Sequence, residues 1–146
     1  MDETPPDIGA PAALAVGLTA AIVAAADDQP RVLVVRTPQD SDALPSGPLE
    51  ARHRTLEAGL RHWVERRTHQ ALGYVEQLYT FGDPGGDPRG HTVTVAYYAL
   101  VKLSDHPPVA ADDAKAVDWF SVSKPPKLAF DLDKILKVAV ERLRAK

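Results

Sequence analysis

Two apolar runs separated by a polar turn constrain the fold of this chain more than any other feature of its sequence. Residues 13–25 are mostly Ala, Val, Leu and Ile, and residues 31–36 (Arg-Val-Leu-Val-Val-Arg) are rich in β-branched side chains. Residues 27–30 (Asp-Asp-Gln-Pro) lie between the runs and form a strong turn signal. The alanine content of the first run would also suit a helix, but the turn favours two strands joined tightly.

The length and composition predict one folded domain. The chain has 146 residues, of which 45% are hydrophobic and 25% charged, so it can bury a core. Residues 1–12 contain three prolines among acidic and small residues, and we expect them to form a flexible N-terminal lead-in. Residues 13–146 are then the folded domain.

The charge balance and the lack of cysteine exclude several functions. With 17 Lys and Arg against 20 Asp and Glu, the formal net charge is −3, so strong binding to nucleic acid or to an anionic membrane is not expected of this chain. No cysteine is present, which excludes disulfides and thiolate metal sites and is compatible with the cytoplasm. The apolar run follows acidic residues and is too short for a membrane span.

A loop over residues 37–52, rich in Pro, Asp and Ser, is expected to lead into a helix that begins near Thr55. One face of this helix carries an apolar stripe with helical spacing, made of Leu56, Leu60, Trp63 and Val64. Another face carries polar side chains, those of His62, Glu65, Arg66 and His69. The first face should pack on the core, and the second is free to meet a ligand.

The rest of the chain predicts three further strands and a closing helix. Residues 73–81 and 91–103 are expected to form a hairpin whose glycine-rich tip is residues 82–90, and a short strand should follow at 116–122. Residues 130–144 mix apolar and basic side chains as a terminal helix does. The order of elements predicts an α/β (α+β) fold with a mixed sheet between helices.

The junction between the loop and the helix has a spaced set of residues. Residues 44–47 (Leu-Pro-Ser-Gly) are followed by Arg61, Trp63 and Glu65. This spacing resembles the signature of the Nudix superfamily, G-x5-E-x7-R-E-U-x-E-E-x-G-U with U a bulky apolar residue, and Gly47 falls on its first Gly. The resemblance implies a Nudix-type α/β/α sandwich.

Four of the Glu and Gly positions of this signature hold other residues, namely His53, His62, Arg66 and Thr68. Nudix hydrolases use the carboxylates of the signature to hold Mg²⁺ against a diphosphate. Arg66 instead brings a positive charge that repels a cation and attracts a phosphate oxygen. Because Glu65 is the sole retained carboxylate, we assign no catalytic residue, no metal ligand and no required cofactor.

A second resemblance runs through residues 72–84, 93–100 and 128–131, and its most specific block is residues 74–83 (Tyr-Val-Glu-Gln-Leu-Tyr-Thr-Phe-Gly-Asp). These blocks are similar to the sensor domain of Nudix-related transcriptional regulators of NAD metabolism and to ADP-ribose pyrophosphatases. The resemblance implies that the chain binds ADP-ribose or a related NAD-derived nucleotide and forms a homodimer. It also implies contact with DNA only through a winged-helix domain that would follow residues 141–146.

Our leading hypothesis from the sequence is a non-catalytic or weakly catalytic sensor. Arg61 or Arg66 would lie near the diphosphate, whereas an exposed helix pair is the plainer interpretation of Arg61 and Glu65. The expected ligand-binding residues are Gly47, Arg61, Glu65, Arg66, Tyr79, Phe81 and Asp83.

Three alternatives remain open. The first is a Mg²⁺-dependent Nudix hydrolase that cleaves a nucleoside diphosphate derivative such as ADP-ribose, with Glu65 as a metal ligand. Its missing carboxylates would come from Glu50, Glu57, Glu76 or Asp83. The second is a dimerisation module with an empty pocket. The third is a transition-metal site of His62, Glu65 and His69, although a solvated polar face is the preferred interpretation of these residues.

Overall fold

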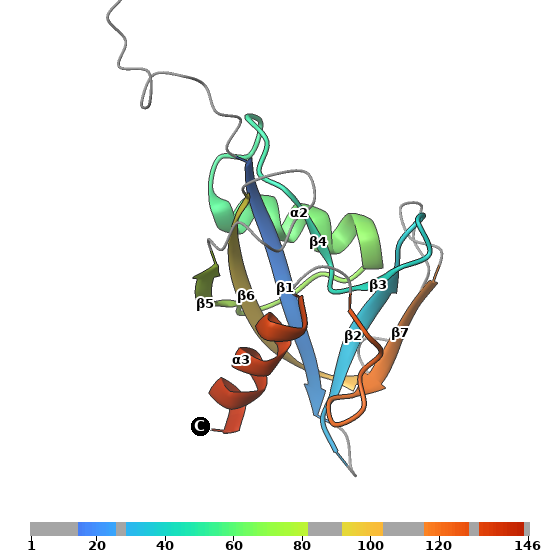
Figure 1. The fold of residues 1–146 in the computed structure, drawn as a ribbon. Coiled ribbons are helices and arrows are strands. Elements are labelled where there is room, and N and C mark those ends of the chain that lie inside the picture. The colour runs from blue at the N-terminus through green and yellow to red at the C-terminus, as the bar shows by residue number, and fades with distance from the viewer. Residues whose placement is uncertain (1–14, 26–28, 82–91, 104–115, 129–131, 145–146) are drawn as a thin grey trace, which may run out of the picture.

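The computed structural model describes residues 15–25, 29–81, 92–103, 116–128 and 132–144, and the predicted lead-in, the hairpin tip and Asp83 lie outside these ranges. Within them, seven strands form one mixed sheet and two helices pack on it (Figure 1). The strands are β1 (Ala15–Ala25), β2 (Arg31–Arg36), β3 (Asp42–Ala43), β4 (Ser46–Pro48), β5 (Glu76–Phe81), β6 (Thr92–Lys102) and β7 (Ala116–Ser121). The helices are α2 (Leu56–Thr68) and α3 (Leu132–Arg144).

The central strand of the sheet is β1. It pairs antiparallel with β2, as the sequence predicts, and parallel with β6 over its whole length, from Ala15 opposite Thr92 to Ala25 opposite Lys102. Residues 18–24 are all buried. A strand covered on both faces is a continuous apolar run instead of an alternating one, which explains why this alanine-rich segment is a strand and not a helix.

The outer strands complete the sheet in the order β3-β2-β1-β6-β5, with β4 paired to β1 and β7 paired to β2. The two short strands β3 and β4 lie inside residues 37–52, which the sequence predicts as loop; prolines and turn residues limit them to two and three residues. The predicted strand over residues 73–81 begins only at Glu76. A bulge interrupts the β5–β6 pairing between Gln77 and Tyr79.

The helix α2 begins and ends with specific caps. The Thr55 hydroxyl accepts a hydrogen bond from the Ala58 amide, as expected for a cap next to the predicted start. His69 ends the helix in the left-handed conformation (φ 58°), and its N–H donates to the Glu65 carbonyl. The predicted apolar stripe is confirmed: Leu60, Trp63 and Val64 are buried and Leu56 packs on the core.

The two helices cover opposite faces of the sheet (Figure 1). Neighbouring residues of β6 point to opposite sides of the sheet and therefore face different helices. Burial, reinforced by the charge of Glu57 on α2, raises the pKa of Tyr97. The Tyr98 hydroxyl instead donates to Glu76, which accepts from Arg142 of α3. A mixed sheet between helices is therefore confirmed.

In the described part of the chain, neither 13-residue helix is long and apolar enough to cross a membrane.

We expect Thr55→Ala to lower the free energy of unfolding by about 1 kcal/mol, because the Ala58 amide loses its acceptor. Urea denaturation followed by circular dichroism measures the change. Thr55→Ser, which keeps the hydroxyl, is the control and should stay close to the wild type. Equal stability of the alanine and serine variants would show that the cap does not support α2.

Candidate functional site

At one end of the candidate site, the Trp63 ring of α2 packs against the backbone of β4. A Cβ built on Gly47 would lie only 2.3–2.5 Å from three atoms of the Trp63 ring, so the backbone of β4 approaches the ring where a side chain cannot fit. The indole N–H donates to the Pro48 carbonyl at 2.7 Å. The Arg67 guanidinium lies 4.7 Å from the ring centre, and its Nε donates to the Ser46 carbonyl at 2.7 Å. Gly47 therefore serves this packing, and its predicted ligand role stays a prediction.

Two histidines meet beside this anchor. His53 comes from the loop before α2 and His62 from the helix, and His53 Nε2 lies 3.2 Å from His62 Nδ1. The Glu50 amide donates to His53 Nδ1 at 3.0 Å, and Arg52 Nη2 lies 3.3 Å from His62 Nε2. The His62 ring also stands edge-on to Trp63, at 4.7 Å between ring centres. The side chains of the loop and helix thus form one contiguous cluster.

The electrostatics of the cluster favour neutral His62. Its pKa is lowered from the usual value, first by burial and then by the electrostatic influence of Arg52, His53 and Arg66. Arg52 donates to the Glu50 carboxylate at 2.6 Å, and this hydrogen bond lowers the pKa of Glu50. The cluster therefore holds one ionised carboxylate against several cationic or donor groups.

Three predicted ligand residues lie on α2, and Arg61 differs from the other two in its contacts. Glu65 and Arg66 are exposed, and Arg66 is near enough to His62 for its charge to lower the pKa of that imidazole. Arg61 forms an ion pair with Glu57 at 3.0 Å, and not the pair with Glu65 considered from the sequence.

The remaining donors of Arg61 bind backbone. Its Nη1 and Nη2 donate to the carbonyls of Leu72 and Gly73 at 2.5 and 2.7 Å. These two bonds hold the segment that leads into β5 against α2. They occupy the Gly73 carbonyl, at the predicted start of the strand, whereas β5 begins at Glu76. The predicted role of Arg61 at a diphosphate stays a prediction.

The predicted aromatic residues lie on the edge strand β5 and not on α2. The rings of Tyr79 and Phe81 meet in a T-shaped contact at 4.9 Å. Tyr79 is 59% exposed although aromatic residues in strands are usually core, and Phe81 is half-buried. Together they present an aromatic surface to solvent.

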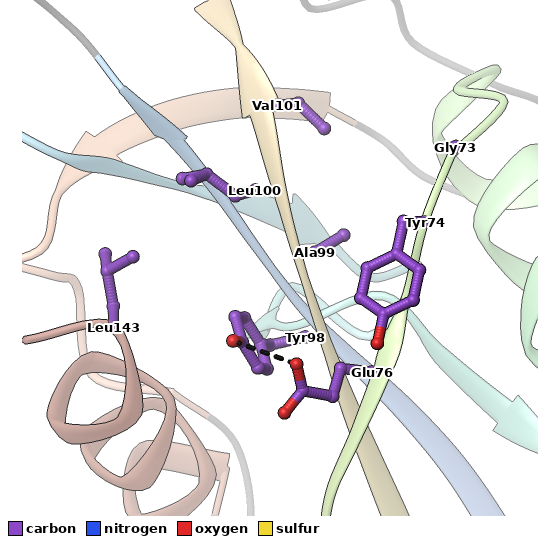
Figure 2. Close-up of a pocket in the computed structure, with 8 residues that line it drawn as sticks. All are labelled: Gly73, Tyr74, Glu76, Tyr98, Ala99, Leu100, Val101 and Leu143. Carbon is purple, nitrogen blue, oxygen red and sulfur yellow. Dashed lines mark hydrogen bonds between the residues drawn. The ribbon is translucent and has the colours of Figure 1, made fainter. Parts of the chain in front are cut away.

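A separate pocket of about 360 Å³ lies between the start of β5, the end of β6 and α3 (Figure 2). Figure 2 shows the Tyr98 hydroxyl on the Glu76 carboxylate inside this pocket, with the exposed Tyr74 ring nearby. The lining residues are Gly73, Tyr74, Glu76, Tyr98, Ala99, Leu100, Val101 and Leu143. Sequence reasoning missed this pocket, because its residues come from three segments and have no shared motif.

The donors of the cluster do not fit Mg²⁺, which prefers several oxygen ligands. Within the described ranges, no three His, Cys, Asp or Glu side chains are grouped to hold a metal ion, and the set of His62, Glu65 and His69 is no exception. Three carboxylates considered as replacements are in ion pairs, namely Glu50 with Arg52, Glu57 with Arg61 and Glu76 with Arg142. The fourth, Asp83, lies outside the described residues.

Comparison with known proteins gives the fold and two relatives of interest. No model of a known protein family matches the sequence. The ADP-ribose pyrophosphatase of Methanocaldococcus jannaschii is 33% identical over 95 residues, which are 65% of this chain and 54% of that protein. This chain thus spans about half the length of that relative.

Among solved structures, the NUDIX domain of Shewanella oneidensis NrtR complexed with ADP ribose is 26% identical, with a TM-score of 0.82 over 97% of this chain and 94% of that one. NrtR of the same organism complexed with a 27mer DNA is 28% identical, with a TM-score of 0.79 over 90% of this chain and 63% of that one. These similarities confirm the Nudix-type fold that the sequence resemblance implies.

We expect Gly47→Ala to destabilise the protein by about 1–3 kcal/mol or more, because the new methyl group overlaps the Trp63 ring. Gly73→Ala is the matched control, since a Cβ there meets nothing within 4 Å. Thermal unfolding followed by tryptophan fluorescence compares the two. A Gly47→Ala protein as stable as Gly73→Ala would contradict the close approach.

The lowered pKa of His62 predicts a pH dependence of stability. As the pH falls below 6.5, the unfolded chain takes up this proton before the folded chain does. The contribution of His62 to the free energy of unfolding is thus complete above pH 6.5 and is lost toward lower pH. Urea titrations between about pH 5 and 7.5 give the free energy of unfolding at each pH. This free energy should change less steeply with pH for His62→Gln than for the wild type. His69→Asn is the control, because asparagine suits the left-handed conformation at the end of α2. It should keep the wild-type dependence of the unfolding free energy on pH.

Proposed function

Because this chain has the Nudix fold, we propose that it is a sensor domain that binds ADP-ribose or a related NAD-derived nucleotide and hydrolyses it weakly or not at all. One observation supports this proposal: Arg52, His53, His62 and Arg66 form one cluster at the junction of the loop and α2, and the last three of these fall on positions where the Nudix signature has carboxylates. Similarity to the NrtR domain complexed with ADP ribose, over nearly the whole length of both chains, supports the choice of ligand.

In this proposal the ligand contacts two regions. Arg66 and Glu65, exposed on α2, meet the diphosphate and ribose, next to the loop whose Gly47 packs on the Trp63 ring of the same helix. The exposed Tyr79 ring, backed by Phe81, offers a stacking surface to the base. Its pairing with Ala96 puts it on the α3 face of the sheet, so a ligand that also meets α2 would have to extend around the edge strand β5. Arg61 acts indirectly, by fixing α2 against the segment before β5.

The output of the sensor extends the proposal beyond this chain. We infer a cytoplasmic homodimer within a transcriptional regulator of NAD metabolism, in which nucleotide binding shifts the population of two dimer geometries. DNA contact would come from a winged-helix domain outside this chain. The similarity to DNA-bound NrtR, of which the chain covers 63%, supports such an arrangement.

The second candidate is a Mg²⁺-dependent hydrolase of ADP-ribose or a similar nucleoside diphosphate derivative. The similarity to the Methanocaldococcus jannaschii ADP-ribose pyrophosphatase favours it. In that case Glu65 would need partners from carboxylates that are engaged with arginines here. A dimerisation module that binds no nucleotide is the remaining possibility.

Calorimetric titration with ADP-ribose and with NAD, with and without Mg²⁺, separates these functions when products are followed by chromatography. We expect metal-independent binding without turnover. Mg²⁺-dependent cleavage would establish the hydrolase, and neither binding nor cleavage would leave the dimerisation module. As a second arm, the double variant His62→Glu and Arg66→Glu should raise Mg²⁺-dependent cleavage, because it returns carboxylates to the motif positions.

A further inference from the structure

Three contacts in the site form a row, and the groups in this row have more N–H donors than acceptors to receive them. The row runs from the Glu50 amide to His53 Nδ1, from His53 Nε2 to His62 Nδ1, and from His62 Nε2 to Arg52 Nη2, at 3.0, 3.2 and 3.3 Å. The backbone amide at one end and the guanidinium at the other can only donate. Two imidazoles therefore lie between two obligatory donors.

The positions of the protons follow from one end of the row. Each neutral imidazole has one donor and one acceptor nitrogen, so the Glu50 amide requires His53 Nδ1 to accept and His53 Nε2 to donate. His62 Nδ1 then accepts from His53, and the proton of His62 lies on Nε2. There it faces the N–H of Arg52. One contact of the row thus brings two donors together.

No movement of protons within the row removes this mismatch. Shifting the proton of either ring to its other nitrogen only transfers the mismatch to a neighbouring contact. Protonating either ring adds a donor and makes a second mismatch. A hydrogen-bond acceptor between His62 and Arg52 satisfies both donors at once, because an oxygen with two lone pairs accepts two hydrogen bonds.

We propose that His62 Nε2 and Arg52 Nη2 form a binding site for an oxyanion of the phosphate class, one oxygen of which accepts from both groups. The Arg52 side chain is 58% exposed, so the site is open to solvent. The Glu50 carboxylate holds Arg52 Nε at 2.6 Å and orients the guanidinium. Arg66, near enough to influence His62, adds charge for a second oxygen.

The same count of protons disfavours a metal ion at His62. A metal needs the lone pair of Nε2, which would move the proton of His62 to Nδ1 and turn it against His53. His53 would then have to carry its proton on Nδ1, against the Glu50 amide. Metal binding therefore breaks a contact of the row, whereas an anion completes it.

The anion site rests on this geometry alone, and only its identification with the diphosphate of a nucleotide rests on the proposed function. The first test is a long-range ¹H–¹⁵N correlation spectrum, which assigns the imidazole tautomers. We expect His53 and His62 both to be protonated on Nε2. A proton on Nδ1 of His62 would overturn the inference.

The second test titrates the protein with inorganic pyrophosphate in a chelating buffer and follows the ¹⁵N shift of His62 Nε2. Arg52→Ala should weaken pyrophosphate binding about tenfold or more, as expected for a lost charge-assisted hydrogen bond. Arg54→Ala is the matched control, because it removes the same charge from the same exposed loop but takes no part in the row. Equal weakening by both variants, or no shift of His62, would contradict a built site.

Parallel titrations with ADP-ribose separate this inference from the proposed function. Pyrophosphate binding that depends on Arg52, without any binding of ADP-ribose, would support the anion site and refute the nucleotide sensor. ADP-ribose binding that is indifferent to Arg52→Ala would support the sensor and refute the anion site. If Arg52→Ala loses binding of both pyrophosphate and ADP-ribose while Arg54→Ala keeps it, the anion site and the nucleotide sensor are both supported.

Discussion

The seat of the Trp63 ring on the backbone at Gly47 is the contact on which the rest of the site depends. It lets the backbone of β4 lie directly on the Trp63 ring of α2, and the Pro48 carbonyl satisfies the indole N–H. The loop that leaves β4 is thereby fixed relative to the helix. Because His53 is on this loop and His62 precedes Trp63 on the helix, their contact at 3.2 Å is a consequence of this packing.

Arginine side chains connect the two helices to neighbouring segments of the sheet. Arg67 ties α2 to β4, Arg61 ties it to the segment before β5, and Arg142 of α3 reaches the Glu76 carboxylate and the Leu78 carbonyl of β5. A planar guanidinium suits this use because its donors bind two acceptors in fixed directions. Both helices are therefore fastened to the edge of the sheet by polar contacts, in addition to the apolar core.

The sequence was sufficient where the signal is local. The turn at residues 27–30 separates β1 from β2, the Thr55 cap marks the start of α2, and helical spacing identifies Trp63 among its buried residues. The Nudix signature also located Gly47, but the reason for a glycine there is visible only once Trp63 is placed on it.

The polar contacts were not predictable in the same way. Arg61 was expected near a ligand, which stays a prediction, but the sequence did not indicate that its donors bind Glu57 and two backbone carbonyls. The contact of His53 with His62, and the role of Arg52 beside them, join a loop to a helix at spacings that no helix or strand period brings together. Such contacts depend on the path of the loop, which follows from tertiary packing.

The parallel pairing of β1 with β6 has a consequence for how the chain is made. Residues 18–24 of β1 are synthesised well before the strand that covers one of its edges, which starts only at Thr92. Strand β2 follows after a short turn and can pair early, but the other edge of this apolar strand stays open until β6 has been made. An unpaired apolar edge invites association with other chains, so a nascent or truncated copy that lacks β6 is the form of this protein most exposed to aggregation.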